Sequence, residues 1–518
     1  MDYLKAVGND IYAGSERILL RGFGLNGWFL PEGYMWKLFN KCDRPRKMEA
    51  MIETLCGKEY ADKFWTTFLD HYITEKDIEF IAKEGYNSVR LPINARHIYE
   101  KDNGQLILKL EMFERIDKLI EWCRKYQVYV ILDMHGAPGG QTGQNIDDSE
   151  ADQPALFLDK QNEEELIYLW KELVKRYKDE VVVAGYDLLN EPLPEFFRQY
   201  NNQVLPLYRR LIKEIREIDK KHMIILEGVH WATDFSIFDT FTKEEAADNI
   251  MLQFHKYWSN PDVESISKFI KYAKDLEVPL FMGEGGENNC DWYTTAFPLY
   301  ERLNISWSFW SYKKMDCDNS PITFEVPRDW NKLIQWMDGS INLLGKEAIE
   351  IFEQFLNCIK NGKANENVLH SLTRTVPVRI PCEAYQDYSI KSERIPGVNL
   401  RMTDPVSLIF ANGSTGDVDY RRLGGEQQSD KDKVLVQLFA GDGVNYLINS
   451  SGYNMKVIIA ADGEGEMKVS LNSQEVSVTV QGPYNYEVSI MTNPDKPNYL
   501  WITCTAGSVK LDNLKLLK

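Results

Sequence analysis

Residues 182–192, VVAGYDLLNEP, pass from an apolar run straight into an Asn-Glu-Pro triplet. A short apolar run of this kind is typical of a buried strand, and Pro192, which cannot donate to a central ladder, predicts that the strand ends there. The ionisable Glu191 therefore stands at the end of a buried strand, beside Asn190. A polar pair in that position indicates a site at one end of a sheet.

Similar apolar runs recur between about residue 17 and residue 355, with amphipathic helical stretches between them. Seven further runs are ILLRGFGLNG (18–27), NSVRLPIN (87–94), VYVILDMHG (128–136), MIILEGVH (223–230), IMLQFHKY (250–257), PLFMGEGG (279–286) and NISWSFWSY (304–312). Eight strands that alternate with helices predict an α/β fold, a (β/α)8 TIM barrel.

The pattern changes after about residue 370. Helical periodicity stops, and short alternating segments such as KVLVQLFAG (433–441) and YLWITCTAG (499–507) are separated by turn residues. This pattern predicts a second, all-β domain, a sandwich. We therefore expect a (β/α)8 catalytic domain over residues 1–370 and a β-sandwich domain over residues 371–518.

The charge and hydropathy exclude several classes of partner. The formal net charge of -18 would repel a nucleic-acid backbone and an anionic membrane surface, so we expect neither as a partner. No run of about 18 apolar residues and no signal-peptide pattern is visible, which predicts a soluble, cytoplasmic protein. The alternative is a secreted protein from which the signal peptide has been removed.

Polar residues that end the strands of a (β/α)8 barrel line the mouth where catalysis occurs. The predicted strands deliver there a set of donors, two carboxylates and a tryptophan, namely Arg90, His135, Asn190, Glu191, His255, Tyr257, Glu284 and Trp310. The carboxylates of Glu191 and Glu284 end the fourth and seventh strands and can face each other across the mouth. A pair of carboxyl groups, one to protonate the leaving oxygen and one to attack or to activate water, is what glycoside hydrolysis needs.

These residues also carry a family resemblance. RLPI, ILDMHG, LLNEP, FHKYW, FMGEGG and SWSFW closely resemble the motifs of glycoside hydrolase family 5, a retaining, cellulase-like (β/α)8 family, over about residues 17–340. The resemblance implies that Glu191 is the acid/base and Glu284 the nucleophile, with Asn190 on the sugar 2-hydroxyl. It implies that the remaining strand-end residues hold the sugar and the nucleophile, namely Arg90, His135, His255, Tyr257 and Trp310. An oligo- or polysaccharide substrate and no cofactor for catalysis follow from it.

Two segments, LNGWFLPEGYMW and HGAPGGQTGQNIDDS, look more like the exo-acting glucanase and β-glucosidase branch of that family. In that branch acidic residues of these loops bind the terminal glucose, which implies Glu32 and one of Asp147 or Asp148. Trp258, just beyond the sixth strand, offers an apolar face to a sugar ring. The preference among β-1,3, β-1,4 and β-1,6 linkages stays open.

The C-terminal segments VPVRIPCEAYQDY and GSVKLDNLKLLK resemble carbohydrate-binding modules of the family 6 and 35 type. The resemblance implies a structural calcium held by Glu383 and Asp512. Two interpretations of this domain stay open, a sugar-binding module and a packing module that braces the barrel.

The leading hypothesis is a retaining β-glycosidase that hydrolyses β-linked glucosides or β-glucan oligosaccharides in exo mode through two glutamates. One alternative is an endo-acting β-glucanase or mannanase. The other is a non-catalytic, sugar-binding barrel.

Overall fold

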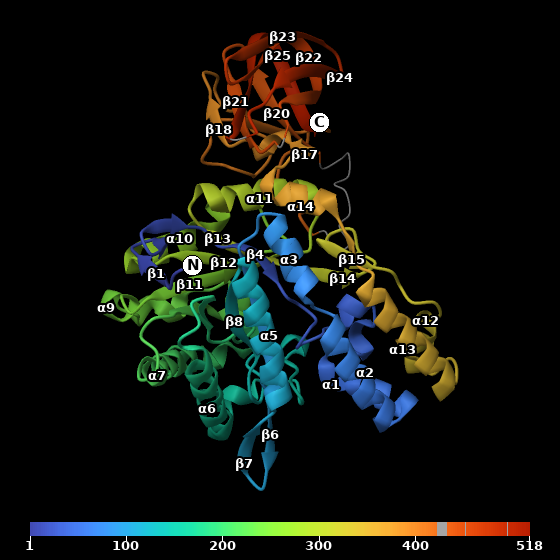
Figure 1. Ribbon diagram of the computed structural model, residues 1–518. Coiled ribbons are helices and arrows are strands. Elements are labelled where there is room, and N and C mark those ends of the chain that lie inside the picture. Colours follow the sequence, from blue (N-terminus) through green and yellow to red (C-terminus); the bar gives the residue numbers. More distant parts are fainter. Residues whose placement is uncertain (422–432, 451, 495) are drawn as a thin grey trace. The chain divides into compact units, whose positions relative to one another are not determined.

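The computed structural model describes residues 1–421, 433–450, 452–494 and 496–518 (Figure 1). The chain forms two compact units. The first comprises Met1–Lys256, Phe269–Gly285 and Asn304–Ala364, and the second comprises Tyr257–Lys268, Gly286–Leu303 and Asn365–Lys518. A division of the chain at residue 370 stays a prediction.

A closed barrel of parallel strands is the frame of the first unit (Figure 1). In chain order its strands are β4 (Arg21–Gly24), β5 (Ser88–Asn94), β8 (Tyr129–Gly136), β9 (Val183–Asp187), β10 (Met223–Glu227), β11 (Ile250–His255), β12 (Leu280–Gly286) and β13 (Ser306–Trp310). Every residue of β5 and β8 is buried, as expected of parallel strands covered on both faces. The prediction of a (β/α)8 barrel is confirmed.

Helices follow the strands and cover the barrel from outside. They include α3 (Glu75–Lys83), α5 (Leu110–Tyr126), α6 (Lys160–Tyr177), α7 (Val204–Arg216) and α10 (Ser267–Leu276), whereas α13 (Gly345–Lys360) packs on the two helices Pro45–Cys56 and Lys58–His71. In α6 the buried residues Leu166, Leu169, Trp170 and Leu173 recur at intervals of three and four, which makes one apolar face. The Asp159 side chain caps this helix by accepting from Gln161 N at 2.9 Å.

The two ends of the barrel differ. At the end where the strands begin, the hairpin sheet of β1 (Leu4–Val7), β2 (Asp10–Ala13) and β3 (Glu16–Ile18) packs Leu4 and Ile11 against buried barrel residues. At the end where the strands finish, long connections carry α1 (Pro45–Cys56) and α2 (Lys58–His71) after β4. One end is therefore closed by apolar packing, and the other is built from loops.

The C-terminal part of the second unit is all antiparallel sheet, as predicted. Its described strands are β17 (Val378–Pro381), β18 (Asp387–Ser389), β19 (Ser407–Phe410), β20 (Val434–Phe439), β21 (Gly443–Ile448), β22 (Asn454–Leu471), β23 (Gln474–Gln481), β24 (Tyr484–Met491) and β25 (Asn498–Leu517). The long strands β22 and β25 pair with each other and with most of the rest. The apolar residues that alternate along them form one buried core.

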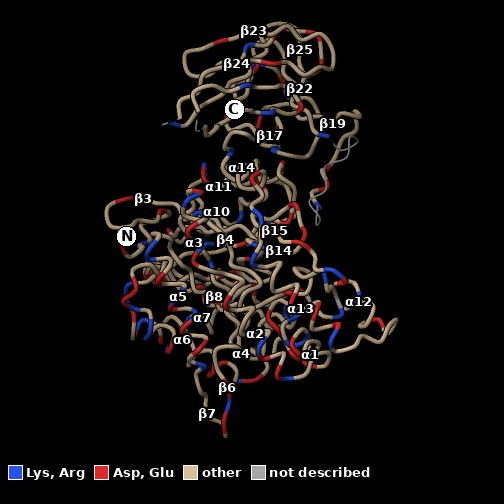
Figure 2. Tube along the Cα trace, turned by 45° about the vertical axis from the view of Figure 1, so that its right-hand side comes forward, with Lys and Arg blue, Asp and Glu red and all other residues tan. Residues whose placement is uncertain are grey.

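The second unit also contains α11 (Cys290–Arg302) and α14 (Glu366–Thr373), which pack against each other and β17. Acidic and basic residues are interspersed along the helices that surround the barrel (Figure 2). Among the residues that the structure describes, no helix combines the length and the apolar character that a membrane crossing needs.

Candidate active site

Because the eight strands are parallel, the residues that end them meet at one rim of the barrel. Arg90 lies within β5, His135 near the end of β8, and Asn190 and Glu191 just beyond β9. The residues that complete the rim are Glu227 on β10, His255 on β11, Glu284 on β12 and Trp310 on β13. All of them are at most 8% exposed.

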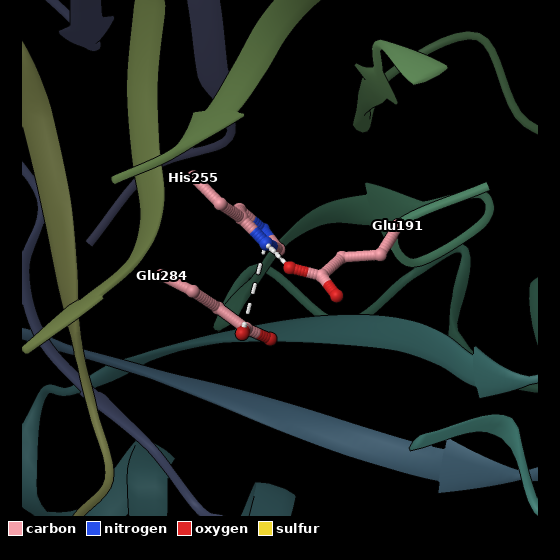
Figure 3. Close-up of side chains that lie close together, drawn as sticks. All are labelled: Glu191, His255 and Glu284. Carbon is pink, nitrogen blue, oxygen red and sulfur yellow. Dashed lines mark hydrogen bonds and ion pairs between the residues drawn. The ribbon is translucent and has the colours of Figure 1, made fainter. Parts of the chain in front are cut away.

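Glu191, His255 and Glu284 form the centre of this rim (Figure 3). His255 Nδ1 lies 2.6 Å from Glu191 Oε1 and 3.6 Å from Glu284 Oε2. One oxygen of each carboxylate and the ring nitrogen all lie within 4.8 Å of one another. The two strand-end carboxylates that the sequence singles out therefore do face each other.

The same three side chains form a group, among the described residues, close enough to hold a metal ion. The hydrogen bond between His255 and Glu191 already uses one ligand atom of each. A proton shared between the His255 ring and the Glu191 carboxyl group accounts for this geometry without a metal.

Arg90 connects Glu284 to the rest of the rim. Its guanidinium is fully buried and contacts Asp133, Asp187, Asn190, Glu227 and Glu284, all at 2.5–3.1 Å. The NH1 group donates to Glu284 Oε1, while NH2 donates to Asn190 Oδ1 at 2.8 Å. One planar group thus fixes the orientation of both Glu284 and Asn190.

One guanidinium cannot neutralise four buried carboxylates. Burial raises the pKa values of Asp133 and Asp187 well above their usual range, and the nearby Arg90 only partly offsets this effect. Burial also acts on Glu227, but His255 and Arg90 outweigh it and lower the pKa of that carboxyl. Burial thus favours the protonated forms of the two aspartates beneath the rim, whereas Arg90 and His255 favour the ionised form of Glu227.

His255 and His135 have opposite charge states. Burial opposes a charged His255 ring, but Glu227, Glu284 and the hydrogen bond with Glu191 outweigh it and raise its pKa well above the usual range. Burial lowers the pKa of His135 to about 3, so this imidazole is neutral. The shift favours a charged His255 ring between the two facing carboxylates, and Gln253 Nε2 lies 3.0 Å from its Nε2.

Trp310 and His135 form one wall of the site. Their rings stack with centroids 5.3 Å apart and an interplanar angle of 9°. The indole Nε1 donates to Tyr34 Oη at 3.1 Å, and His135 Nδ1 lies 2.7 Å from Asp133 Oδ2. The wall is thus a flat aromatic surface with a fixed orientation.

Several polar residues of this network were not singled out from the sequence, namely Asp133, Gln141, Asp187, Glu227 and Gln253. Asp133 lies two residues before His135 in β8, so strand periodicity places both on one face, a signal that the sequence did contain. Glu227 is the last residue of β10, and Glu284 likewise lies near the end of its apolar run. A carboxylate at the end of an apolar run was thus a second signal in the sequence. Gln253 lies two residues before His255 in β11 and carries the same signal as Asp133, whereas Gln141 in a loop and Asp187 inside an apolar run carry none.

The predicted glucose-binding carboxylates lie on two loops that meet. Asn145 Nδ2 donates to Glu32 Oε2 at 3.2 Å, which joins the loop after β4 to the loop after β8. Asp147 accepts from the backbone N–H groups of four residues of its own loop. Asp148 is bound by Asn94, Arg46 and Arg96. These partners favour a loop-ordering role for both aspartates, and their contact with glucose stays a prediction.

Tyr257 and Trp258 directly follow β11 in the chain and belong to the second compact unit. Their rings lie 5.6 Å apart, and Trp258 Nε1 donates to Glu287 O at 3.1 Å. The contacts of Tyr257 and Trp258 with a sugar stay predictions.

The predicted calcium ligands have other surroundings. Asp512 Oδ2 accepts from Lys433 Nζ at 2.5 Å and from Asn513 Nδ2 at 2.8 Å. Glu383 is buried, and no described group hydrogen-bonds its Oε2. Calcium takes six to eight oxygen ligands. With Lys433 already on Asp512, these two carboxylates do not make a calcium site by themselves.

Comparison with known proteins gives three kinds of match. The family described as Cellulase (glycosyl hydrolase family 5) matches residues 54–316. A β-xylosidase of Phanerodontia chrysosporium is 33% identical over 258 residues, 50% of this chain and 52% of the relative. Endoglucanase C of Acetivibrio thermocellus is 26% identical over 320 residues, 50% of this chain and 90% of the relative.

The chain thus spans about half the length of the β-xylosidase that it matches. Among solved structures, that of an endogalactoceramidase covers 99% of this chain and is itself covered completely, with a TM-score of 0.50 and 16% sequence identity. At this identity the likeness concerns the fold alone.

Proposed function

Because the chain belongs to glycosyl hydrolase family 5, we propose that it hydrolyses β-linked glucosides or β-glucan oligosaccharides with retention of configuration. Glu284 attacks the anomeric carbon and forms a glycosyl-enzyme, while Glu191 protonates the departing oxygen. Glu191 then takes a proton from the water that releases the sugar. As a glycoside hydrolase, the protein needs only its own side chains for these two steps.

The observation that carries the proposal is the separation of the two carboxylates. Retaining glycosidases hold their carboxyl groups about 5–5.5 Å apart, whereas inverting ones leave about 6.5–9.5 Å for a water molecule. Oxygens of Glu191 and Glu284 lie within 4.8 Å of each other, which supports direct attack. Arg90 and the charged His255 place positive charge beside Glu284.

Two exposed aromatic residues support an assignment for the leaving group. Phe196 and Trp231 are 57% and 39% exposed, and their rings lie 6.2 Å apart. Their loops follow β9 and β10 and join where His230 N donates to Leu193 O at 2.8 Å, two residues beyond Glu191. The leaving oxygen must lie beside the acid, so we place the leaving group against this pair.

The opposite side supports exo action. There the Asn145–Glu32 bond joins the loops after β4 and β8, which supports a closed end beside the terminal sugar. Glu32 is only 4% exposed, so few sugar units fit beyond it. For the second unit we propose sugar binding through the exposed rings of Tyr453, Tyr484 and Tyr499.

Proton NMR of the first product tests the mechanism. With an aryl β-glucoside as substrate, we expect β-glucose to appear first and the α-anomer to follow only by mutarotation. An α-anomer as the first product would contradict double displacement.

The endo-acting alternative is favoured by the name of one relative, an endoglucanase. Viscosity separates the two modes. An exo enzyme releases reducing ends from a soluble β-glucan while the viscosity falls slowly, whereas an early collapse of viscosity would establish endo action.

A further inference from the structure

Glu227, the last residue of β10, has no role in the steps above, yet it contacts the machinery at three points. Its Oε2 accepts from the backbone N–H of Glu191 at 2.7 Å, and the same oxygen lies 3.5 Å from His255 Nε2. Its Oε1 accepts from Arg90 NH2 at 3.0 Å and from Gln253 Nε2. The side chain is fully buried.

The backbone of Glu191 explains the first contact. Glu191 has a φ of 44°, in the left-handed region that residues with a Cβ rarely adopt. Such a conformation persists only where its surroundings determine it. A charge-assisted hydrogen bond from the Glu191 N–H to a buried carboxylate is a strong restraint of this kind. The position of the acid/base therefore depends on Glu227.

The second contact acts through charge. His255 is faced by Glu227 on its Nε2 side and by Glu191 and Glu284 on its Nδ1 side. Arg90 contacts two of these carboxylates, Glu227 and Glu284. A carboxylate on the Nε2 side keeps the ring charged, so Nδ1 can donate to Glu191 Oε1.

We propose that Glu227 is a positioning residue for acid/base catalysis: it holds the Glu191 backbone in its left-handed conformation and, through His255, orients the Glu191 carboxyl group so that Oε1 accepts from Nδ1 and Oε2 is left to carry the catalytic proton. The inference rests on the proposed function, in which Glu191 is the acid/base and Glu284 the nucleophile. It predicts that Glu227 affects the protonation step of Glu191 and not the attack by Glu284.

Leaving groups of different basicity separate the two glutamates. Phenyl β-glucoside has a poor leaving group and needs the acid, whereas 2,4-dinitrophenyl β-glucoside does not. We expect Glu227→Gln to lower kcat/KM for the phenyl glucoside about 100-fold, at the low end of what acid catalysis contributes. For the dinitrophenyl glucoside kcat/KM changes less than about threefold, as this step needs no proton donor.

Asp187→Asn is the matched control. Asp187 is an equally buried carboxylate of the same cluster, and it contacts Arg90 Nε at 2.8 Å. The substitution acts through Arg90, which orients Glu284 and Asn190. We therefore expect Asp187→Asn to lower kcat/KM for both glucosides by the same factor. If Glu227→Gln also lowered kcat/KM for both glucosides by the same factor, the proposal would be overturned. Glu227 would then be a general structural residue.

Histidine titration gives a readout that does not depend on turnover. The chain has seven histidines, which 15N-histidine labelling makes visible by NMR. The signal that disappears in the His255→Asn variant belongs to His255. We expect Glu227→Gln to lower the pKa of His255. An unchanged His255 titration would overturn the proposal, whether or not the protein hydrolyses either glucoside. A wild-type protein that hydrolysed neither glucoside would refute only the proposed function.

Glu227→Asp serves if the glutamine variant does not fold. Aspartate keeps the charge but withdraws the acceptor from the Glu191 N–H. We expect the same selective loss on phenyl glucoside with a smaller effect on the His255 titration, and an equal loss on both glucosides would again overturn the proposal.

Discussion

Arg90 is fully buried and serves four carboxylates and one amide with a single planar group. Lysine cannot replace it, because an ammonium group offers three donors from one point and not a fork. We expect Arg90→Lys to lower kcat/KM at least about 100-fold, since Glu284 and Asn190 lose their common restraint. Kinetics on an aryl β-glucoside measure this loss.

The matched control is Arg115→Lys. Arg115 pairs with Asp70 at 2.8 Å on the outside of the barrel. We expect kcat/KM to stay within about twofold of wild type, because surface ion pairs contribute about 0–1 kcal/mol and this pair is remote from the chemistry. An equal loss in both variants would show that any arginine substitution harms the fold.

Glu383 makes stability depend on pH. Burial raises its pKa from 4.5 to about 8, so the folded chain binds a proton that the unfolded chain releases above about pH 4.5. The contribution is therefore fully present below pH 4.5 and is lost as the pH rises to about 8, by roughly 1.4 kcal/mol per unit. We expect Glu383→Gln to unfold at a higher temperature than wild type at pH 8.

The two proteins should differ little at pH 4.5, where both side chains are neutral. Thermal unfolding followed by circular dichroism at both pH values measures the difference. A wild-type protein as stable at pH 8 as the glutamine variant would contradict a raised pKa for the buried Glu383.

The sequence predicted most of the site at the scale of single residues. Arg90, His135, Asn190, His255 and Trp310 gather with Glu191 and Glu284, because each lies in or just beyond a strand of one parallel barrel. The sequence could not show which carboxylates keep their protons, since that depends on burial and on how many charges share one guanidinium.

At the scale of elements, the loop after β8 is held from within. Asp147 satisfies four backbone N–H groups, and Asp148 joins the loop to Arg46 and Arg96. The sequence predicted acidic residues here but not the arginine partners of Asp148, which come from segments about 50 and 100 positions away.

Asp148→Ala tests what this loop needs. Arg96 would lose one of its two carboxylate partners at a buried position, so we expect the free energy of unfolding to fall by about 3 kcal/mol. Urea denaturation measures it, with Asp62→Ala as the control at an exposed i,i+4 pair. A rise in KM at unchanged stability would instead favour the predicted contact with glucose.

At the scale of the whole molecule, the second unit is not only the C-terminal sheet. It includes α11, which packs on α14 and β17 and buries Trp292, Phe297 and Tyr300. The sequence predicted the change of pattern near residue 370, but it could not show that a helix from an earlier segment packs with the later one. Such a contact joins residues about 75 positions apart and leaves no local signal.

A chain that ends at Ala364 tests this organisation. It lacks the partners of α11, and exposure of three large aromatic side chains costs on the order of 5 kcal/mol. We expect the shortened chain to unfold at a lower temperature than the whole chain, and residues 365–518 added as a separate fragment to restore part of the loss. A shortened chain of unchanged stability would contradict the packing of α11 within the second unit.

Trapping of the glycosyl-enzyme tests the central claim most directly. A 2-deoxy-2-fluoroglucoside with a dinitrophenyl leaving group slows hydrolysis of the intermediate, and peptide mass spectrometry then locates the attached sugar. We predict one sugar per chain, in ester linkage to Glu284 and absent from the Glu284→Gln variant. A sugar attached to Glu191, or turnover without a covalent intermediate, would contradict the account.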